Sequence, residues 1–281
     1  MKQLRDRIAV VTGAAAGLGR AMARRFAAEG MQVLVADVNE AGARRVTAEI
    51  AASGATAIAA QVDVGEPASV AALAELAAAA LGGCDLLVAN VGVQRIGRVD
   101  ALTREDWQWV LGVNLFGTVE TVRAFLPLLR KSSDGHLLFT GSVSSVVSVP
   151  RLAAYTASKM AVLGYAETLR LELAGEGIGV TALLPAGMVT THLESSAAAR
   201  PATLGRSPDL DPDDAVAVVQ ILAPTPDSMQ TPEDAIRDLV PALLENRPYV
   251  VTHAPNRGTV AERFTSILAA FDRADDAGKR A

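Results

Sequence analysis

The sequence predicts an α/β protein with one doubly wound parallel sheet and helices on both of its faces. Short β-branched runs alternate with longer alanine-rich stretches over most of the chain. The apolar runs are nearly continuous, which is typical of parallel strands buried on both faces. No internal repeat and no second domain interrupts this pattern, so we expect a single domain over residues 1–273.

Each element can be assigned from this alternation. The strands are expected at Ile8–Val11, Val33–Val35, Ala57–Val62, Leu86–Val88, Leu137–Phe139, Val180–Leu184 and Tyr249–Thr252. The helices are expected at Leu18–Glu29, Glu40–Ala52, Pro67–Ala80, Arg104–Lys131, Ala153–Ala174 and Val260–Phe271, with a further helix beginning at Thr231. A proline at the first position of one helix and acidic residues at the start of another fit helix N-termini.

The segment 186–230 differs in composition from the rest of the chain, because it contains Gly187, Gly205 and several prolines. A connection of this length in a compact domain is either functional or disordered. We therefore expect a substrate loop or lid here. The polar residues 274–281 are expected to form a frayed tail.

Composition narrows the class of function. The 281 residues carry a net charge of −5 and no basic block, which disfavours nucleic-acid binding. The single cysteine, Cys84, cannot form an internal disulfide, so a reducing cytoplasm is expected. The apolar stretch after Ile8 is broken by glycines, and Val70–Val93 is interrupted by charges, so we expect neither a signal peptide nor a membrane span.

A glycine-rich turn follows the first strand. Its spacing is G-x-x-x-G-x-G, and the residues that would contact a ligand are Gly13, Ala16, Gly17, Leu18 and Gly19. Glycines allow a tight turn and let phosphates approach the N–H groups at a helix N-terminus. The strand before the turn and the helix after it supply the context that a dinucleotide site requires. The alternative is an ordinary glycine-rich turn.

An acidic residue, Asp37, follows the second strand 18 residues after Gly19. A carboxylate at this distance is expected to bind the ribose hydroxyls of NAD. It would repel a 2′-phosphate by about 4 kcal/mol at 4 Å before screening. Neither Ala16 nor Val38 supplies a compensating cation, so NAD is expected rather than NADP. Alternatively, Asp37 is a solvated turn residue, and Arg44 and Arg45 would favour NADP if their helix turned them inward.

Tyr155 and Lys159 are four residues apart and therefore share one helix face. A lysine ammonium near a phenol lowers its pKa, which makes tyrosine usable as a general acid or base. Ser142 lies near the end of the strand Leu137–Phe139, at the edge where such sheets bind ligands. By spacing alone, such a pair is more typical of an ordinary surface helix face, so the spacing does not establish catalysis.

Other chemistries find little support. His136, His192 and His253 are scattered, so a surface or capping role is expected for each and no metal site. Ser142 is not part of a G-x-S-x-G elbow, which argues against a hydrolase. The glycine turn lacks the G-K-[ST] of a nucleotide hydrolase.

Together these motifs resemble the short-chain dehydrogenase/reductase family over about residues 5 to 190. The glycine turn resembles the family's cofactor turn, Ala89-Asn90-Val91-Gly92 its N-N-A-G segment, and Val113-Asn114 its helix asparagine. Ser142 stands 13 residues before Tyr155, which is the family spacing, and Tyr155 and Lys159 match Y-x-x-x-K. The resemblance implies a Rossmann-like fold.

The resemblance also implies roles for residues. Tyr155 would be the acid/base, Lys159 would lower its pKa and bind the nicotinamide ribose, Ser142 would orient the substrate oxygen, and Asn114 would support a water relay. His192 falls where the family's substrates usually lie. The further implied cofactor contacts are Asp63, Val64, Asn90, Gly92, Pro185, Gly187, Met188 and Thr190; counted from Gly187 instead of Pro185, the last two would be Val189 and Thr191.

The expected function is NAD-dependent interconversion of a hydrophobic or aromatic secondary alcohol and its ketone. The segment 186–230 and the C-terminus distantly resemble bacterial aryl-ether Cα-alcohol dehydrogenases. The alternatives are a 3-oxoacyl thioester reductase, for which NADP would be expected, and a non-catalytic nucleotide-sensing module. The helices Arg104–Lys131 and Ala153–Ala174 resemble the family's subunit-pairing helices, which implies a homodimer or homotetramer.

Overall fold

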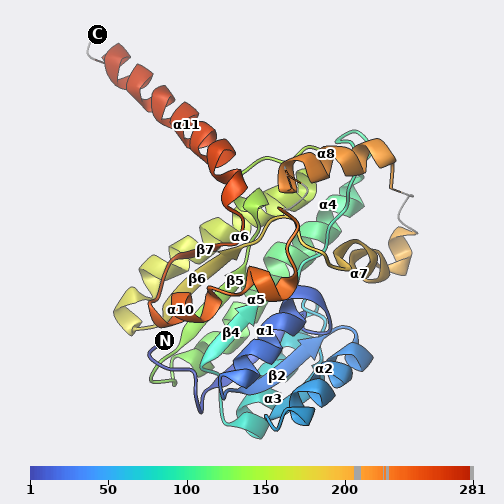
Figure 1. Cartoon of the computed structure of the whole chain (residues 1–281), viewed down its shortest axis with the longest axis vertical. Helices are drawn as coiled ribbons and strands as arrows, with labels where there is room; N and C mark the ends of the chain where they lie inside the picture. The colour runs from blue at the N-terminus through green and yellow to red at the C-terminus, as the bar shows by residue number, and fades with distance from the viewer. Residues whose placement is uncertain (206–209, 224, 226–227, 279–281) are drawn as a thin grey trace.

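The computed structural model describes residues 1–205, 210–223, 225 and 228–278. Its centre is a sheet of parallel strands in the order β3-β2-β1-β4-β5-β6-β7 (Figure 1). The strands are β1 (Ile8–Thr12), β2 (Gln32–Asp37), β3 (Ala57–Gln61), β4 (Leu86–Ala89), β5 (His136–Thr140), β6 (Gly179–Leu184) and β7 (Tyr249–Val251). The predicted doubly wound parallel sheet is confirmed. The strand order reverses between β1 and β4, the position at which such sheets bind ligands.

Helices cover both faces of the sheet (Figure 1). On one face lie α1 (Gly17–Ala28), α2 (Glu40–Ala52) and α10 (Leu239–Leu244), which bury Phe26, Ile50 and Leu243 against the strands. On the other lie α3 (Pro67–Leu81), α5 (Gly117–Leu129) and α6 (Ala153–Glu172), which bury Phe125 and Leu169. Each such side chain contributes about 1.5–3 kcal/mol through its burial. The ends of the strands are thereby held in fixed positions.

The helix predicted over 104–131 has an irregularity in its middle. It divides into α4 (Arg104–Leu111), a π-helical turn at Gly112–Phe116, and α5. Asn114 lies in the π-helical turn and is fully buried. Such turns are rare and often occur at functional sites.

The segment 186–230, here called the lid, contains more regular structure than the sequence predicts. It includes α7 (His192–Ala198), a 3-10 turn at Ala202–Leu204, and α8 (Pro212–Leu222), and α9 (Pro232–Ala235) follows it. Asp211 caps α8 by accepting a hydrogen bond from Asp213 N, and Pro212 occupies the first turn. Pro208, Pro224 and Pro226 lie outside the described residues.

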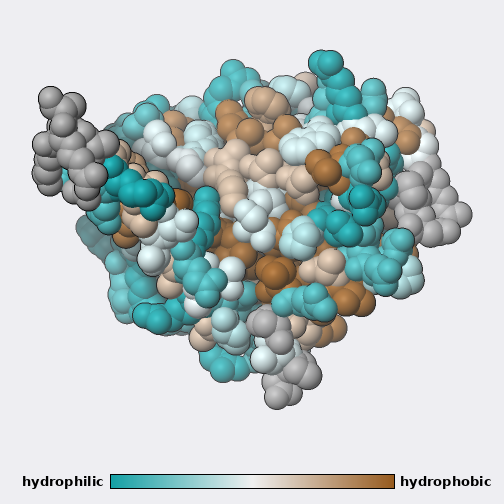
Figure 2. Space-filling view, turned by 90° about the horizontal axis from the view of Figure 1, so that it is seen from above, coloured by the Kyte–Doolittle hydropathy of each residue, from teal (hydrophilic) through white to brown (hydrophobic). Residues whose placement is uncertain are grey.

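The face seen from above carries part of the lid (Figure 2). Apolar residues reach the surface there between polar ones (Figure 2). Val216 and Val219 are among the exposed apolar residues of α8. The helix therefore buries only part of its apolar surface.

The last helix, α11 (Arg257–Gly278), leaves the body of the molecule and extends away from it (Figure 1). It is longer than the predicted Val260–Phe271 and includes residues 274–278, which we expected in a frayed tail; residues 279–281 lie outside the described part. Arg263 Nη1 donates to Val146 O at 3.0 Å and fixes the first turns. Among the described helices, none is long and apolar enough to cross a membrane.

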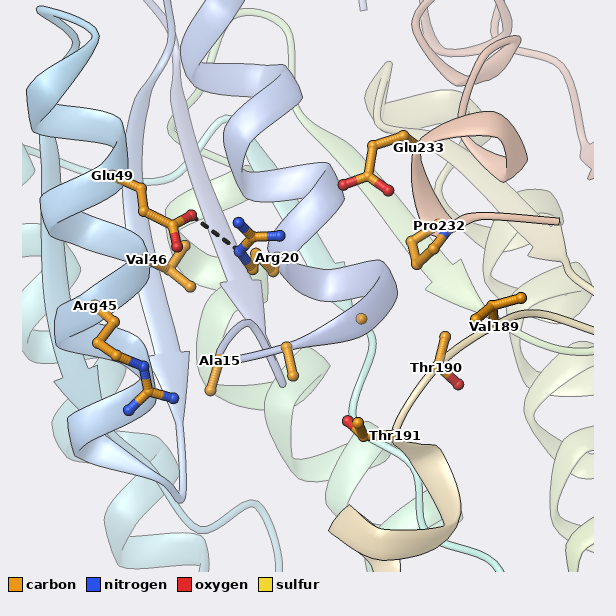
Figure 3. A pocket seen from close by; sticks show the side chains of 12 residues that line it. Ala15, Arg20, Arg45, Val46, Glu49, Val189, Thr190, Thr191, Pro232 and Glu233 are labelled. Carbon is orange, nitrogen blue, oxygen red and sulfur yellow. Dashed lines mark hydrogen bonds and ion pairs between the residues drawn. The ribbon is translucent and has the colours of Figure 1, made fainter.

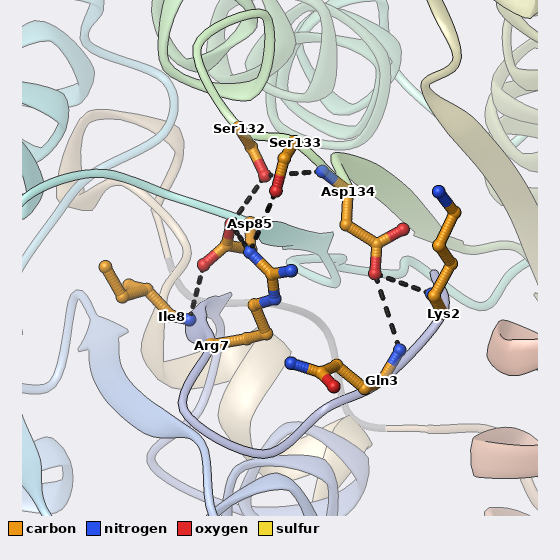
Figure 4. Close-up of polar contacts among 8 residues, drawn as sticks. All are labelled: Lys2, Gln3, Arg7, Ile8, Asp85, Ser132, Ser133 and Asp134. Atoms are coloured by element: carbon orange, nitrogen blue, oxygen red, sulfur yellow. Dashed lines mark hydrogen bonds and ion pairs between the residues drawn. The ribbon is translucent and has the colours of Figure 1, made fainter.

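Polar contacts join the chain near the amino ends of β1, β4 and β5 (Figure 4). One Asp85 carboxylate oxygen accepts a hydrogen bond from Ile8 N at 2.8 Å, and the other accepts from Ser132 Oγ. Arg7 lies 3.5 Å from the same carboxylate. Because ligands bind at the carboxyl ends of the strands, this cluster stabilises the sheet rather than the site.

The sequence led us to expect a surface or capping role for each histidine, but two of the three are buried. His136 is fully buried and its Nε2 lies 2.9 Å from Thr181 Oγ1. His253 is also buried, with Nε2 2.8 Å from Gly187 O. Both form part of the core beside β6. Only His192 is half-buried.

Candidate active site

The glycine turn lies at the N-terminus of α1 and fits a phosphate group. The helix begins after an extended Ala16, has no side-chain cap and has no acidic residue in its first turn. Its first N–H groups are therefore left for an anionic ligand. A Cβ atom at Gly19 would lie 2.1 Å from Gly13 O, so only glycine allows this close approach.

A cavity of about 420 Å³ opens beside the turn (Figure 3). Its walls come from the turn, α1, α2, the start of the lid and α9. The residues are Ala15, Ala16, Gly17, Arg20, Arg45, Val46, Glu49, Val189, Thr190, Thr191, Pro232 and Glu233. Of the predicted cofactor residues, Ala16, Gly17 and Thr190 line it, so the cavity fits the phosphate part of a dinucleotide at this helix end.

Asp37 is held directly against the glycine turn. One carboxylate oxygen accepts a hydrogen bond from Ala15 N and the other from Asn39 N, both at 2.9 Å. Arg44 pairs with Glu40 on the outside of α2, whereas Arg45 lines the cavity opposite Ala15 (Figure 3). The structure therefore places one acidic and one basic group beside the glycine turn.

Asn90 joins the ends of three strands. Its Nδ2 donates to Thr12 O and Gly13 O at 3.0 and 3.1 Å, and its Oδ1 accepts from Thr140 Oγ1 at 3.0 Å. These partners follow from β1, β4 and β5 meeting at one edge. Asn90 thus holds the shape of the glycine turn from beneath.

The remaining predicted adenine-side residues lie at the ends of β2 and β3. Val38 is half-exposed, and Asp63 is exposed and accepts a hydrogen bond from Gly65 N at 2.9 Å. Val64 is buried against the Gly117 position of α5. The three are near the carboxyl ends of β2 and β3.

Tyr155, Lys159 and Ser142 come together as predicted. The Ser142 hydroxyl lies close enough to the Tyr155 hydroxyl to lower its pKa, and Lys159 Nζ lies 5.7 Å from the centre of the Tyr155 ring. Lys159 Nζ also donates to Thr140 O at 2.7 Å, which fixes the ammonium at the end of β5. All three side chains are buried.

Burial has the larger influence on the acidity of these groups. It raises the pKa of Tyr155 to about 12, and the hydrogen bond from Ser142 acts in the opposite direction. It lowers the pKa of Lys159 to about 8. We expected Lys159 to lower the phenol's pKa, but loss of solvent disfavours the phenolate more strongly in this arrangement. The resting Tyr155 is therefore a protonated acid at neutral pH.

Asn114 fixes the backbone that faces the lysine. Its Oδ1 accepts from Val93 N at 2.7 Å, and its Nδ2 donates to Val93 O and to Ser158 Oγ, both at 2.9 Å. Gly92 lies just before this clamp. A Cβ atom there would be 3.2 Å from Lys159 Nζ and 3.8 Å from Asn114 Oδ1. Gly92 therefore leaves the space that the ammonium occupies.

The start of the lid is fixed from β7. His253 Nδ1 accepts from Ala186 N at 3.3 Å, and its Nε2 donates to Gly187 O. Ala186 and Gly187 come directly after Pro185, which ends the stretch that begins with β6. Among the predicted nicotinamide contacts, Thr190 faces the Gly17 position and lines the cavity. The Met188 side chain instead packs against the core.

Two buried polar interactions hold the lid on the body of the protein, and no local sequence pattern predicts either of them. Ser196 Oγ accepts from Gln94 N at 3.1 Å and donates to His192 O at 2.7 Å. Arg200 Nη1 pairs with Asp106 Oδ1 at 2.6 Å. The C-terminal half of α7 and the residues just after it are thereby held on the body of the protein. His192 comes to lie beside Tyr155, with ring centres 6.2 Å apart.

Comparisons with known proteins agree with this architecture. A family model described as short chain dehydrogenase matches residues 7–201. A solved short chain dehydrogenase/reductase from Burkholderia phymatum, in complex with NAD, has a TM-score of 0.88 and 33% identity, covering 96% of this chain and 97% of that one. The chain belongs to the short-chain dehydrogenase/reductase family, a family of oxidoreductases.

Individual relatives differ in length and in name. A protein named "Probable oxidoreductase EphD" from Mycobacterium tuberculosis is 35% identical over 189 residues, 67% of this chain and 32% of that protein. The chain thus spans about a third of that relative. A C alpha-dehydrogenase from Sphingobium is 26% identical over 270 residues, 95% of this chain and 87% of that protein.

Proposed function

We propose that this protein interconverts a hydrophobic or aromatic secondary alcohol and its ketone, with NAD as the cofactor. The observation that carries the proposal is the buried phenol of Tyr155, with the Ser142 hydroxyl close to it and the Lys159 ammonium beside its ring. An acid/base of this kind is needed wherever a carbinol oxygen loses or gains a proton.

In ketone reduction, Tyr155 donates its phenolic proton to the carbonyl oxygen. In alcohol oxidation, the phenolate accepts the proton of the hydroxyl, and the nearby ammonium of Lys159 favours that charged form. Ser142 holds the same substrate oxygen and orients it toward Tyr155. The nicotinamide, when bound, supplies the hydride chemistry.

The surroundings of Tyr155 support an apolar substrate. Tyr155 packs in one cluster with Ile96, Val149, Leu152 and Val218. Two of these residues come from the loops before α6, and Val218 comes from α8 of the lid. The Sphingobium relative is named a C alpha-dehydrogenase, which supports a dehydrogenase reaction at a carbon centre.

The preference for NAD rests on Asp37. Its carboxylate lies at the glycine turn, where it would accept hydrogen bonds from ribose hydroxyls and repel a 2′-phosphate. Arg45 acts in the opposite direction, so the preference is a balance of two charges. The Burkholderia relative is described in complex with NAD.

The test is formation of NADH from NAD with a panel of aryl, aliphatic, steroidal and hydroxyacyl secondary alcohols. We expect turnover with aryl alcohols, and Tyr155→Phe should lower it by about 10²–10⁴-fold while NADH binding persists. Full activity of Tyr155→Phe would refute the mechanism. Turnover of hydroxyacyl thioesters with NADPH alone would favour the thioester reductase.

Two further parts of the proposal concern assembly and location. The exposed Phe116 and Leu171, on the α5 and α6 side, support pairing of two subunits through these helices. A sedimentation measurement that finds only monomer would refute pairing. The buried free thiol of Cys84 is compatible with a reducing cytoplasm.

A further inference from the structure

The last helix, α11, has an apolar face that the described part of its own chain leaves uncovered. The helix extends away from the body of the molecule (Figure 1), and none of its residues from Val260 to Asp275 is buried. Phe264, Ile267, Leu268 and Phe271 are 47%, 41%, 62% and 70% exposed. Apolar side chains gathered in this way on an exposed face are typical of an interaction site.

The direction of α11 is fixed at its first turns. Asn256, the residue before the helix, is buried and donates from Nδ2 to Ile221 O at 2.9 Å. Arg263 Nη1 donates to Val146 O at 3.0 Å, and the guanidinium lies 5.6 Å from the centre of the Phe264 ring. These contacts hold the first two turns on the body, and the exposed face begins where they end.

The spacing of the apolar residues fits a second helix. They follow one another at intervals of four, three, four and three residues, at Val260, Phe264, Ile267, Phe271 and Ala274. This pattern places them along one seam of the kind through which two helices pack, and Leu268 widens it. A helix is therefore the partner that this face fits best.

The seam is symmetrical about its midpoint. Phe264 stands three residues before Ile267, and Phe271 stands three residues after Leu268. When two copies of α11 run antiparallel across a two-fold axis between Ile267 and Leu268, Phe264 of one copy lies opposite Phe271 of the other. Ile267 then lies opposite Leu268 of the other copy. Such self-complementarity is required where one patch pairs with the same patch of a second subunit.

The exposed area matches such a pair. With about 200 Å² for an aromatic side chain and somewhat less for Ile and Leu, the exposed fractions leave on the order of 400 Å² of apolar surface on each helix. Because about 60% of an interface is apolar, this corresponds to about 700 Å² per partner. A standard interface buries about 800 Å² per partner. The face is thus large enough for a stable pair without a further protein.

The charges on α11 do not suit a membrane surface. Glu262 adjoins Arg263, Asp272 adjoins Arg273, and the helix contains no lysine. Helices that lie on anionic lipid carry an excess of Lys or Arg on the polar face. This balance of charges favours a protein partner.

We infer that α11 pairs with α11 of a second copy of this chain, antiparallel and through the seam around Phe264 and Phe271. Most of the stability of a helix in a protein comes from packing of its apolar face, and the pairing supplies that packing for a helix that projects from the body. The pairing is separate from that expected through α5 and α6, and it adds a second two-fold axis to an assembly built that way.

The first test compares two double variants that add the same charges to different faces of α11. Phe264→Glu with Phe271→Glu changes the seam. Thr259→Glu with Ser266→Glu changes exposed positions on the back of the helix, at the same spacing of seven residues. Sedimentation velocity should give the seam variant half the mass of the wild-type assembly and the control the wild-type mass. Equal masses for the wild type and the seam variant, or a wild type that is already monomeric, would overturn the inference.

The second test reports the direction of the pair. Cys84, the single native cysteine, is buried and does not compete in a cross-linking experiment. On oxidation, co-expressed Phe264→Cys and Phe271→Cys chains should give a disulfide-linked dimer, whereas each variant alone should give little. Equal yields from the single variants, or no link between the co-expressed chains, would exclude the antiparallel pair.

A membrane as the occupant gives a different result. The wild type should stay in solution when vesicles of anionic lipid are sedimented. Binding to the vesicles that Phe264→Glu with Phe271→Glu abolishes would assign the face to a lipid surface and overturn the inference. None of these readouts depends on turnover, so they decide on α11 whatever the reaction proves to be.

Discussion

Arg200 and Asp106 are 94 residues apart in the chain, yet their side chains form a buried ion pair that joins the lid to α4. Asp106 also belongs to a capping box with Thr103 at the start of α4. Burial alone would raise the pKa of Asp106, but hydrogen bonds from Thr103 and Arg200 hold it below its usual value. One carboxylate therefore stabilises a helix and anchors the lid.

Replacement of Arg200 should lower the stability of the protein. Arg200→Leu leaves a buried carboxylate without its partner, so we expect a loss of about 3–5 kcal/mol in the free energy of unfolding. Urea denaturation measures it. Since α7 also loses an anchor, KM for the alcohol should rise.

The matched control is Arg200→Leu combined with Asp106→Asn. Asparagine keeps a side-chain oxygen for the capping hydrogen bond but carries no charge. Most of the lost stability should return in the double variant. Equal stability of the wild type and Arg200→Leu would show that the ion pair contributes nothing.

The acidity of Tyr155 predicts different pH dependences for the two directions. Burial raises the pKa of Tyr155 to about 12, so the phenolate needed for oxidation increases with pH, whereas the phenol needed for reduction stays almost fully protonated below pH 10. We expect kcat/KM for alcohol oxidation to rise between pH 7 and 10 and that for ketone reduction to stay nearly constant. Initial rates in both directions check this. A flat oxidation profile over that range would argue against Tyr155 as the base.

Cofactor preference should respond to Asp37 and Arg45 in opposite ways. Asp37→Ser removes the charge that repels a 2′-phosphate, and we expect the NADP/NAD ratio of kcat/KM to increase by at least about tenfold. Arg45→Ala in the same background should lower NADP use again, because Arg45 lines the cavity next to the turn. An unchanged ratio in Asp37→Ser would remove the basis for the expected preference.

Gly92 offers a test of how closely Lys159 is positioned. The Cβ of Gly92→Ala would stand 3.2 Å from Lys159 Nζ, so the ammonium must move by a few tenths of an ångström. We expect kcat to fall by about three- to tenfold with a smaller change in stability. Gly164→Ala is the control, because nothing lies within 4 Å of a Cβ on that glycine of α6. Equal activity of both variants would contradict the argument.

Buried histidines predict sensitivity to mild acid. Burial lowers the pKa of His136 to about 3, below the value of about 6.5 in an unfolded chain. Protonation therefore favours the unfolded state, so this stability is complete above pH 6.5 and is lost as the pH falls. The slope for one histidine approaches about 1.4 kcal/mol per pH unit.

This slope can be measured by denaturation between pH 6.5 and 5, where most carboxylates have not begun to titrate. The free energy of unfolding of His136→Asn should change less steeply with pH than that of the wild type. The variant should also be less stable at pH 7, because it loses the contact with Thr181. The same slope in both proteins would mean that His136 is not responsible.

The sheet and the reacting groups could be predicted because their signals are local. Nearly continuous apolar runs such as Ile8–Val11 can be buried only in the middle of a sheet, and the spacing of Tyr155 and Lys159 places both on one helix face. Ser142 could be placed because it follows a strand that ends at the ligand-binding edge. In each case, the sequence signal lies within a few residues, although the strands themselves pair with distant ones, as Ala9 of β1 does with Leu86 of β4.

The lid and the acidity of the site could not be predicted in this way. The ion pair of Arg200 with Asp106 joins distant residues, and nothing in either neighbourhood indicates the other. The direction of the Tyr155 pKa depends on how completely the lid and the loops exclude solvent, which spacing does not report. The π-helical turn at Asn114 likewise depends on contacts with Val93 and Ser158, which come from other elements.

The proposed reacting residues and the segment around α7 and α8 occupy different parts of the chain. The residues proposed for proton transfer follow β5 or lie in α6 and the π-helical turn, whereas Val218, which packs with Tyr155, is carried on a separate contiguous stretch. That stretch contacts the rest of the protein at several points, among them the ion pairs of Arg200 and Asp214. Exchange of residues 186–223 between relatives that retain Gln94 and Asp106 should therefore transfer substrate range and leave the reaction intact. Diversification of such an enzyme would require changes in one short interval of its gene.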